Sequence, residues 1–282
     1  MDSDTLTIEQ FEDFRAVIAT NLGIKMPPEK KVMLQSRLHR RLRELGLESF
    51  EEYHRRFFGD SENQSEELEQ LLNVVTTNKT DFFREPDHFD YLAKRVLPEW
   101  LRRRPAPFFR VWCAGCSSGE EAYTIAMTLL EERQRADFDF TILATDVSTR
   151  VLDIARQAVY TDEQATPIPP AFRSRYLLRS RDKQARQVRI APEVRAKVRF
   201  GHLNFLAPDY GIRETMDAVF FRNVLIYFNR EAQQEIVGRI CRHLRVGGHL
   251  FIAHAETLQS LVLPLRTAGT AVYQRQPGEA SP

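Results

Sequence analysis

The sequence predicts an α/β protein in which a helical N-terminal domain precedes a doubly wound sheet with a small inserted β-subdomain. Glycine is scarce and helical spacing dominates before about residue 105, whereas short apolar β-type runs alternate with helical stretches after it. The 282 residues are 43% hydrophobic and 28% charged, which is typical of a folded chain. No apolar run approaches the roughly 20 residues that span a membrane.

Residues 1–75 are expected to form the helical domain. Thr7 and Gln10 make a capping box that opens a helix ending before Gly23, and Gly46 stops the next helix. Residues 76–104 are expected to form a linker and a further helix, which prolines break. The expected helices are, in order, 7–22, 29–45, one that opens at residue 49, 65–75 and 86–104.

Residues 105–282 predict strands that alternate with helices, and therefore a parallel sheet with right-handed crossovers. Ligands of such sheets bind at the carboxyl ends of the strands, so candidate site residues should lie there. The segment 161–202 interrupts the alternation and is expected to form the inserted β-subdomain. The expected strands are 108–113, 140–144, 217–221, 250–253 (after a turn at Gly247-Gly248) and 271–275, and the expected helices are 119–132, 148–159 and 230–243.

A loop of small residues follows the first strand and opens a helix. Its spacing, Gly115-x-Ser117-x-Gly119, is not the G-x-G-x-x-G of dinucleotide-binding proteins and is closer to the G-x-G-x-G of S-adenosylmethionine enzymes. Small residues let the backbone approach a ligand, and the helix start favours an electronegative group. Asp146 ends the second strand, where a carboxylate would reach ribose hydroxyls. The loop and this acid together favour a nucleotide-type cofactor.

Other interpretations of this loop stay open at this point. It also fits the G-x-S-x-G of a nucleophile elbow, and a serine hydrolase would then use Ser117 with Asp217 and His254. Two glutamates at the helix start would repel the oxyanion of that reaction. Cys113 and Cys116 have the spacing of a redox or metal-binding pair, but no second pair or nearby histidine completes a zinc site. A tight turn without a ligand is the remaining interpretation.

The segment that joins the two halves combines polar residues with two phenylalanines. It fits a capped turn with core aromatics, and it equally fits a lid that turns Asn78, Thr80 and Arg84 towards a cofactor. An arginine in such a lid could hold a carboxylate through paired hydrogen bonds.

A second group of polar residues ends the strand 217–221. Arg222 and Asn223 follow it directly, on the ligand side of the sheet, and Tyr227 comes shortly after. A helix cap with a buried aromatic residue would explain the same pattern. A methyltransferase acting on adenine nitrogen would carry an Asn/Asp-Pro-Pro-aromatic loop here. The missing prolines argue against that activity.

The charge balance limits the class of partner. Lys and Arg number 40 against 39 Asp and Glu, a net charge of +1, which argues against a protein that binds nucleic acid over its whole surface. Two local runs are nonetheless basic, the helix Lys30–Arg43 and the insert. They fit solvated faces or an acidic partner, either protein or nucleic acid. The basic residues of the insert are Arg173, Arg175, Arg179, Arg181, Lys183, Arg186, Arg189, Arg195, Lys197 and Arg199.

Cysteine and histidine usage points to a reducing compartment and to no metal. Three cysteines cannot form a disulfide framework, so the cytosol is the expected location. The acidic, polar start of the chain is not expected to act as a secretory signal. The seven histidines show no metal-binding spacing. His254 stands out among them because it follows a strand on the ligand side.

Taken together, six motifs resemble the chemoreceptor glutamate methyltransferases of bacterial chemotaxis, the CheR family, over almost the whole chain. The motifs are TTN at 76–78, FFRE at 82–85, SGEEAYTIA at 118–126, Thr145-Asp146, Leu203-Asn204 and FRNVLIYF at 221–228. The resemblance implies a helical N-terminal domain, a linker and a Rossmann-like, S-adenosylmethionine-dependent methyltransferase domain with a small inserted β-subdomain.

The resemblance further implies S-adenosylmethionine as cofactor, S-adenosylhomocysteine as its product and no metal. It gives Arg84 and Tyr227 the role of positioning the substrate carboxylate. Glu121 would lie near the charged end of the cofactor, and Asp146 at its ribose. The residues expected to contact or surround the cofactor are Asn78, Thr80, Arg84, Gly115, Glu121, Asp146, Asn204, Phe205, Arg222 and Asn223.

The activity implied is methyl transfer to glutamate side chains of chemoreceptors, which forms methyl esters in sensory adaptation. The basic run Lys30–Arg43 would meet the acidic methylation region of the receptor's cytoplasmic domain, and the basic insert could contribute. Some family members bind a receptor tether peptide through a glycine-containing loop of the insert, but Ser180–Arg186 contains no glycine. Tether binding therefore stays in doubt.

A cytoplasmic monomer that neither binds nucleic acid nor enters the membrane is expected. Besides the hydrolase, the alternative is a signalling adaptor that keeps the methyltransferase fold without transferring methyl groups.

Overall fold

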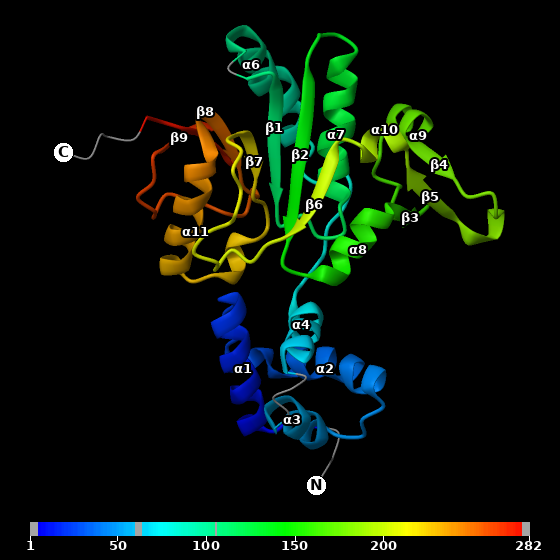
Figure 1. The fold of residues 1–282 in the computed structure, drawn as a ribbon, viewed down its shortest axis with the longest axis vertical. Coiled ribbons are helices and arrows are strands. Elements are labelled where there is room, and N and C mark those ends of the chain that lie inside the picture. The colour runs from blue at the N-terminus through cyan, green and yellow to red at the C-terminus, as the bar shows by residue number, and fades with distance from the viewer. Residues whose placement is uncertain (1–4, 60–63, 105, 278–282) are drawn as a thin grey trace.

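The computed structural model describes residues 5–59, 64–104 and 106–277. They form a small body of helices and a larger body built on a sheet, which meet end to end (Figure 1). None of the described helices is long and apolar enough to cross a membrane. Residue 105, where the sheet domain is expected to begin, lies outside the described residues, as do residues 60–63 of the polar stretch before the fourth helix.

Four helices form the small body. They are α1 (Ile8–Leu22), α2 (Lys31–Leu45), preceded by a 3-10 turn (Pro28–Lys30), α3 (Phe50–Gly59) and α4 (Gln64–Val75). The predicted capping box is present between Thr7 and Gln10, and Gly23 ends α1 in the left-handed region with a φ of 66°. The apolar faces share one core, in which the rings of Phe14 and Tyr53 stack 5.4 Å apart.

The linker leads into a helix that packs against the sheet. It has three parts, α5 (Asp87–Tyr91), a π-helical turn (Leu92–Val96) and α6 (Leu97–Arg103). The Trp100 ring lies 5.4 Å from that of Phe109 in the first strand. The helix predicted over 86–104 is thus present, with a π-turn that the sequence pattern did not indicate.

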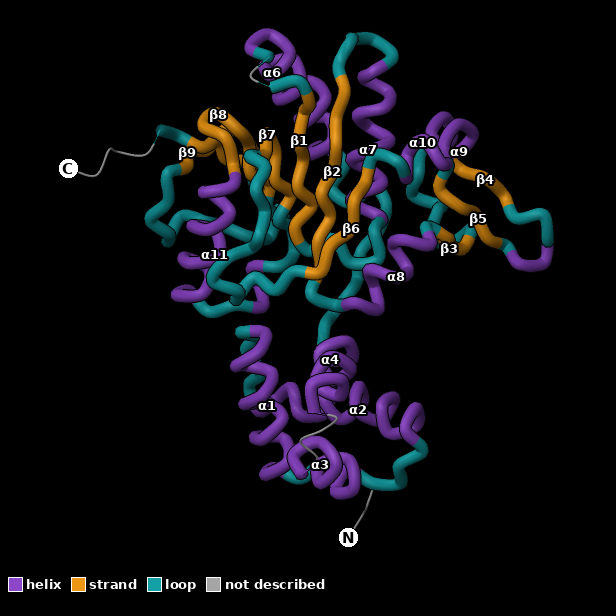
Figure 2. Tube along the Cα trace, viewed as in Figure 1, coloured by secondary structure: helices purple, strands orange, loops and turns teal. Residues whose placement is uncertain are grey.

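Seven described strands form the main sheet, in the order β6-β2-β1-β7-β8-β10-β9. The run from β6 through β2 and β1 to β7 can be followed in Figure 2. The first five are parallel, whereas β10 runs antiparallel to β8 and to β9. The predicted parallel, doubly wound sheet is therefore correct for β1, β2, β7 and β8, whereas the strand expected at 271–275 runs antiparallel as β10. The strands are β1 (Phe108–Ala114), β2 (Asp139–Asp146), β6 (Val198–His202), β7 (Met216–Phe220), β8 (Leu244–Phe251), β9 (Leu265–Gly269) and β10 (Val272–Arg275).

Helices cover both faces of this sheet, which explains why the central strands β1 and β7 are largely buried. They include α7 (Glu120–Arg133), α8 (Thr149–Gln157) and α11 (Arg230–His243). Within β1, Val111 and Cys113 enter the core shared with α7, whereas Trp112 and Ala114 enter the core shared with α11. The expected turn at Gly247-Gly248 is wrong, since both glycines lie inside β8.

The insert forms a separate antiparallel sheet in the order β3-β5-β4. Its elements are β3 (Val159–Thr161), α9 (Pro170–Tyr176), β4 (Leu177–Arg179), a 3-10 turn (Lys183–Ala185), β5 (Gln187–Ile190) and α10 (Pro192–Arg195). The end of the expected range 161–202 needs correction, because residues 198–202 form β6, the parallel edge strand beside β2. Short strands with charged residues are typical of sheet edges. Because β6 has this pattern and the strands of the insert have it too, the sequence pattern did not separate them.

Candidate functional site

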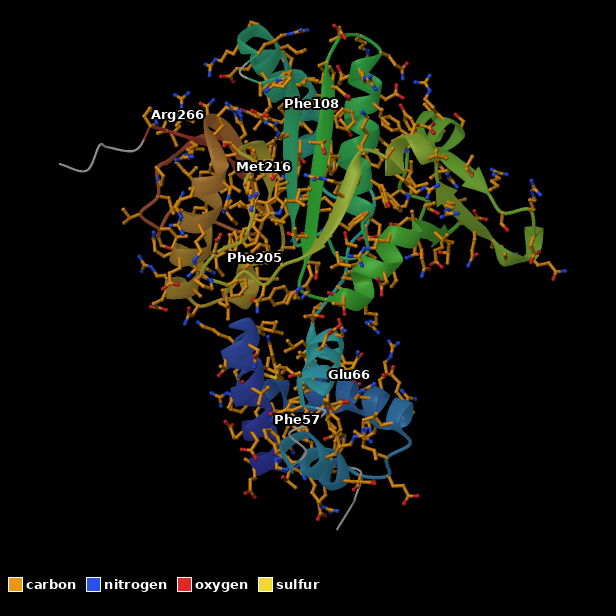
Figure 3. The ribbon with its side chains drawn as sticks, viewed as in Figure 1. Phe57, Glu66, Phe108, Phe205, Met216 and Arg266 are labelled. Carbon is orange, nitrogen blue, oxygen red and sulfur yellow. The ribbon has the colours of Figure 1, made fainter. Side chains whose placement is uncertain are left out.

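A cavity of about 230 Å³ lies between the helical body and the carboxyl ends of β1, β2 and β7. Phe205, in its lining, is on the side of the sheet body that faces the helices, whereas Phe108 at the start of β1 lies near the opposite end (Figure 3). Every residue predicted to position substrate or contact cofactor lines this cavity. They are Asn78, Thr80, Arg84, Gly115, Glu121, Asp146, Asn204, Phe205, Arg222, Asn223 and Tyr227.

The loop between β1 and α7 forms the floor of the cavity through an unusual backbone. Gly115, Ser117 and Gly119 all have positive φ, of 84°, 48° and 98°. A Cβ on Gly115 would lie 2.5 Å from Cγ2 of Val224, so a glycine is required for the two ligand-side loops to approach. The strand–loop–helix arrangement predicted from the small residues is confirmed.

The carboxylate of Asp146 sits where β2 ends, and the residue is 8% exposed. One oxygen accepts a hydrogen bond from the backbone N–H of Ser117 at 2.8 Å, and the other from that of Ser148 at 3.0 Å. Burial raises the pKa of Asp146, and these backbone donors oppose the rise. Each oxygen keeps a lone pair for a further donor, such as a ribose hydroxyl.

Arg222 joins three segments beneath the cavity and is 4% exposed. Its Nη1 donates to Glu121 Oε2 at 2.7 Å, and its Nη2 to Glu85 Oε2 at 3.0 Å. Nη2 also donates to the Arg84 carbonyl. The guanidinium lies 5.5 Å from the centre of the Phe89 ring. Two carboxylates thus hold one buried cation, as buried charges require.

The linker closes one side of the cavity over the glycine loop. The carbonyl of Asn78 accepts from the Ser117 hydroxyl at 2.9 Å. Arg84 Nη1 donates to the Lys79 carbonyl at 3.4 Å, a long bond that leaves the guanidinium able to turn to an anion. Asn78, Thr80 and Arg84 all line the cavity, and their role as a lid over a cofactor stays a prediction.

The helical body closes the opposite side. The Asn204 amide donates to the carbonyl of Asn21 at the end of α1 at 2.6 Å, and the Tyr227 carbonyl accepts from Lys25 N at 3.1 Å. These contacts bring the aromatic ring of Tyr227 to the edge of the cavity beside the helices. Cofactor and substrate would therefore bind between the two bodies.

Sequence reasoning missed the contribution of α2 and the turn before it. Lys30, Met33 and Arg37 all line the cavity. Arg37 donates to Thr77 Oγ1 at 2.6 Å and to the Val75 carbonyl, and burial lowers its pKa. Positions 30, 33 and 37 share one helix face, so periodicity could have separated them from the outward-facing charges of the same run.

The geometry does not assemble the alternative sites. Ser117 donates to a backbone carbonyl, while His254 Nε2 lies 3.0 Å from Asp87 Oδ2. Asp217 is paired with Arg245 at 2.9 Å, where β7 begins, at the opposite end of the strand from the loop. A nucleophile, base and acid are therefore not brought together. Cys113 and Cys116 are buried, and burial raises the pKa of both thiols, which disfavours redox chemistry.

The residues of the cavity fit S-adenosylmethionine by their chemistry. Asp146 offers acceptors for ribose hydroxyls, and Phe205 contributes a buried apolar wall. Glu121 offers negative charge to an ammonium or sulfonium, and Arg222 Nε is a buried donor without a hydrogen-bond partner among the described residues. The cavity thus combines the apolar lining and few convergent polar groups that cofactor sites use.

Comparison with known proteins agrees with this chemistry. The family model described as CheR methyltransferase, SAM binding domain, matches residues 78–273, and the CheR methyltransferase all-alpha domain matches residues 9–76. Chemotaxis protein methyltransferase 2 of Pseudomonas aeruginosa is 38% identical, covering 95% of this chain and 93% of its own length. The chemotaxis protein methyltransferases of Escherichia coli and Borreliella burgdorferi are 37% and 33% identical, over 95% and 90% of this chain and 91% and 90% of their own lengths.

Proposed function

The chain belongs to the CheR methyltransferase family, and we propose that it methylates glutamate side chains of a chemoreceptor. It is an S-adenosylmethionine-dependent methyltransferase with a role in chemotaxis. The observation that carries the proposal is the single cavity in which Asp146, Glu121 and Arg222 meet Arg84 and Tyr227.

The residues of the cavity suit a carboxylate acceptor. A glutamate has a reference pKa of about 4.3, so it reaches the site as an anion and needs no general base. The cofactor supplies a methyl group on a positively charged sulfonium. Arg84 and Tyr227 orient the acceptor carboxylate within the cavity between the two bodies. Asp146 and Glu121 hold the ribose and the charged end of the cofactor.

The docking surface is proposed to include the outward face of α2. Arg40 and Arg43 are exposed there, whereas Arg41 is held by Glu67 in a bidentate pair at 2.7 and 2.9 Å. Arg43 offers an exposed positive charge to an acidic receptor segment, whereas Arg40 is paired with Glu44 at 3.1 Å. The acceptor lies in the cytoplasmic part of a receptor, which would place the enzyme in the cytoplasm.

The insert is proposed not to bind a receptor tether peptide. Ser180–Arg186 contains no glycine, so Arg186 places a long side chain where the backbone takes a left-handed φ of 45°. A peptide copied from a receptor C-terminus should show no saturable binding to the full-length protein. Light scattering should give the mass of a monomer.

The test of the acceptor class is transfer of labelled methyl groups to a purified receptor cytoplasmic fragment. Label that alkali releases identifies an ester. Tyr227→Phe should lower kcat about tenfold, the loss expected for one positioning hydrogen bond. Tyr273→Phe, a half-buried tyrosine of β10, is the matched control and should leave kcat unchanged. Equal rates for both variants, or alkali-stable label, would contradict the proposal.

A further inference from the structure

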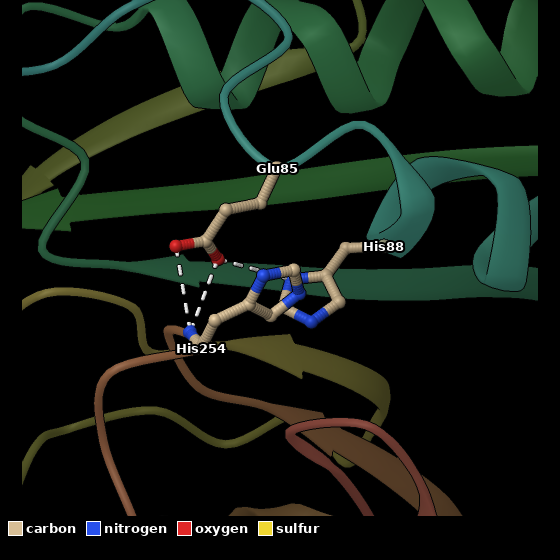
Figure 4. Close-up of side chains that lie close together, drawn as sticks. All are labelled: Glu85, His88 and His254. Atoms are coloured by element: carbon tan, nitrogen blue, oxygen red, sulfur yellow. Dashed lines mark hydrogen bonds and ion pairs between the residues drawn. The ribbon is translucent and has the colours of Figure 1, made fainter.

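Three side chains that can bind metals meet beside the cavity, outside its lining. Glu85 comes from the linker, His88 from the first turn of α5 and His254 from the segment after β8. Each offers one ligand atom, and these atoms all lie within 4.8 Å of one another (Figure 4). The sequence pattern hid this cluster, because 166 positions separate His88 from His254 (254 − 88 = 166).

The orientation of His88 favours a cation beside it. His88 is 1% exposed, and its Nε2 lies 3.3 Å from the Thr270 carbonyl, so Nε2 carries the hydrogen and Nδ1 the lone pair. Nδ1 is buried without a hydrogen-bond partner among the described residues and lies 3.6 Å from Glu85 Oε2. A lone pair facing a carboxylate is unfavourable unless a cation lies between them.

His254 completes the set and gives access from solvent. Its Nε2 lies 3.0 Å from Asp87 Oδ2, which leaves Nδ1 for a metal. Metal-binding histidines commonly donate their second nitrogen to a carboxylate or carbonyl, as His254 does to Asp87 and His88 to Thr270. The His254 side chain is 38% exposed, so an ion can enter without unfolding the site.

We propose that Glu85, His88 and His254 bind a divalent transition-metal ion, best matched by Zn²⁺, and that the ion draws Glu85 away from Arg222. Two imidazole nitrogens and one carboxylate are a common protein ligand set for zinc, with a fourth position left for water. The site is regulatory rather than catalytic, since its ligands do not line the cavity.

Occupation of this site is coupled to the cofactor cavity through Glu85. Glu85 Oε2 is a partner of Arg222 Nη2, and Arg222 lines the cavity. Without Glu85, the positive charge of Arg222 beside the cavity is neutralised less, and the metal ion adds further positive charge. Both changes oppose a cationic sulfonium, so zinc lowers the affinity for S-adenosylmethionine, and the cofactor lowers the affinity for zinc by the same factor.

The first experiment is titration of the untagged, full-length protein with Zn²⁺ against a chromophoric chelator. His254→Ala should weaken zinc binding by about tenfold or more, because it removes a ligand. His54→Ala is the matched control, since His54 forms a similar pair with Asp13 at 2.7 Å in the helical body. Unchanged zinc affinity in His254→Ala, or an equal loss in His54→Ala, would overturn the proposal.

The second experiment is calorimetric titration with S-adenosylmethionine, with saturating Zn²⁺ or with chelator. Zinc should weaken cofactor binding by about fivefold or more in the parent protein and in His54→Ala, but not in His254→Ala. Equal cofactor affinity with and without zinc would refute the coupling. Zinc binding is measured without cofactor or receptor, so its failure is distinct from a failure of the proposed acceptor.

Discussion

Arg222 Nη1 lies 2.7 Å from Glu121 Oε2, although the two residues are 101 positions apart. Arg222→Ala would leave Glu121 and Glu85 without their shared cation in a buried site. We expect a loss of about 3–5 kcal/mol in the free energy of unfolding, measured by urea titration. Arg245→Ala breaks one ion pair, with the buried Asp217, rather than two, and should cost less. A smaller loss for Arg222→Ala than for Arg245→Ala would contradict the central role of this cation.

Asp146→Asn tests the proposed ribose contact. The amide keeps one acceptor oxygen but loses the charge, so we expect the Kd for S-adenosylmethionine to rise at least tenfold, consistent with about 1.5–3 kcal/mol for charged hydrogen bonds. Calorimetry measures the Kd. Asp139→Asn, at the other end of β2, is the control and should leave the Kd within about twofold. The same Kd in both variants would remove Asp146 from the site.

Arg37 and Arg43 lie on the same basic helix but are predicted to act differently. Arg37→Ala removes the bonds to Thr77 and the Val75 carbonyl that hold the linker, so cofactor affinity should fall about tenfold. Arg43→Ala changes an exposed side chain, so it should weaken receptor binding and not cofactor binding. Calorimetry with cofactor, and separately with receptor fragment, distinguishes the two. If both variants lost receptor binding and kept cofactor affinity, Arg37 and Arg43 would not have the separate roles predicted here.

Stability should fall in mild acid because of His249. Burial lowers its pKa to about 4, whereas an unfolded histidine titrates near about 6.5. The unfolded chain therefore binds the proton first, and stability is full above the unfolded pKa and lost as the pH falls from about 6.5 towards 4. The expected loss from this group between pH 7 and pH 5 is about 2 kcal/mol.

Urea titrations at both pH values measure this loss. His249→Leu should reduce the pH dependence, whereas His54→Ala should retain it. If His249→Leu keeps the full pH dependence, other groups are responsible.

The sequence predicted the helices and four of the parallel strands because these depend on local patterns, whereas Glu121, Asn204 and Phe205 were expected at the site only from the resemblance to the CheR family. Local features mark where elements begin and end. They are the capping box of α1, the small-residue loop after β1 and the polar residues after β2 and β7. The sequence did not predict that β10 pairs antiparallel with β8, since strand order depends on contacts between distant segments. The pairing of β6 with β2 also joins segments that are far apart in the sequence, so the sequence pattern assigned β6 wrongly to the insert.

The sequence by itself thus determined the two-part architecture and the ligand side of the sheet, which follow from periodicity and spacing, and its motifs resemble a family that implies the type of cofactor. Only the tertiary structure decided which charged side chains are paired or turned inward and which stay exposed. It turned Arg37 inward while leaving Arg43 exposed, and it brought His254 to Glu85 and His88. Such choices depend on how the two bodies and the sheet bury each side chain, because burial makes an ion pair or an unpartnered nitrogen energetically important.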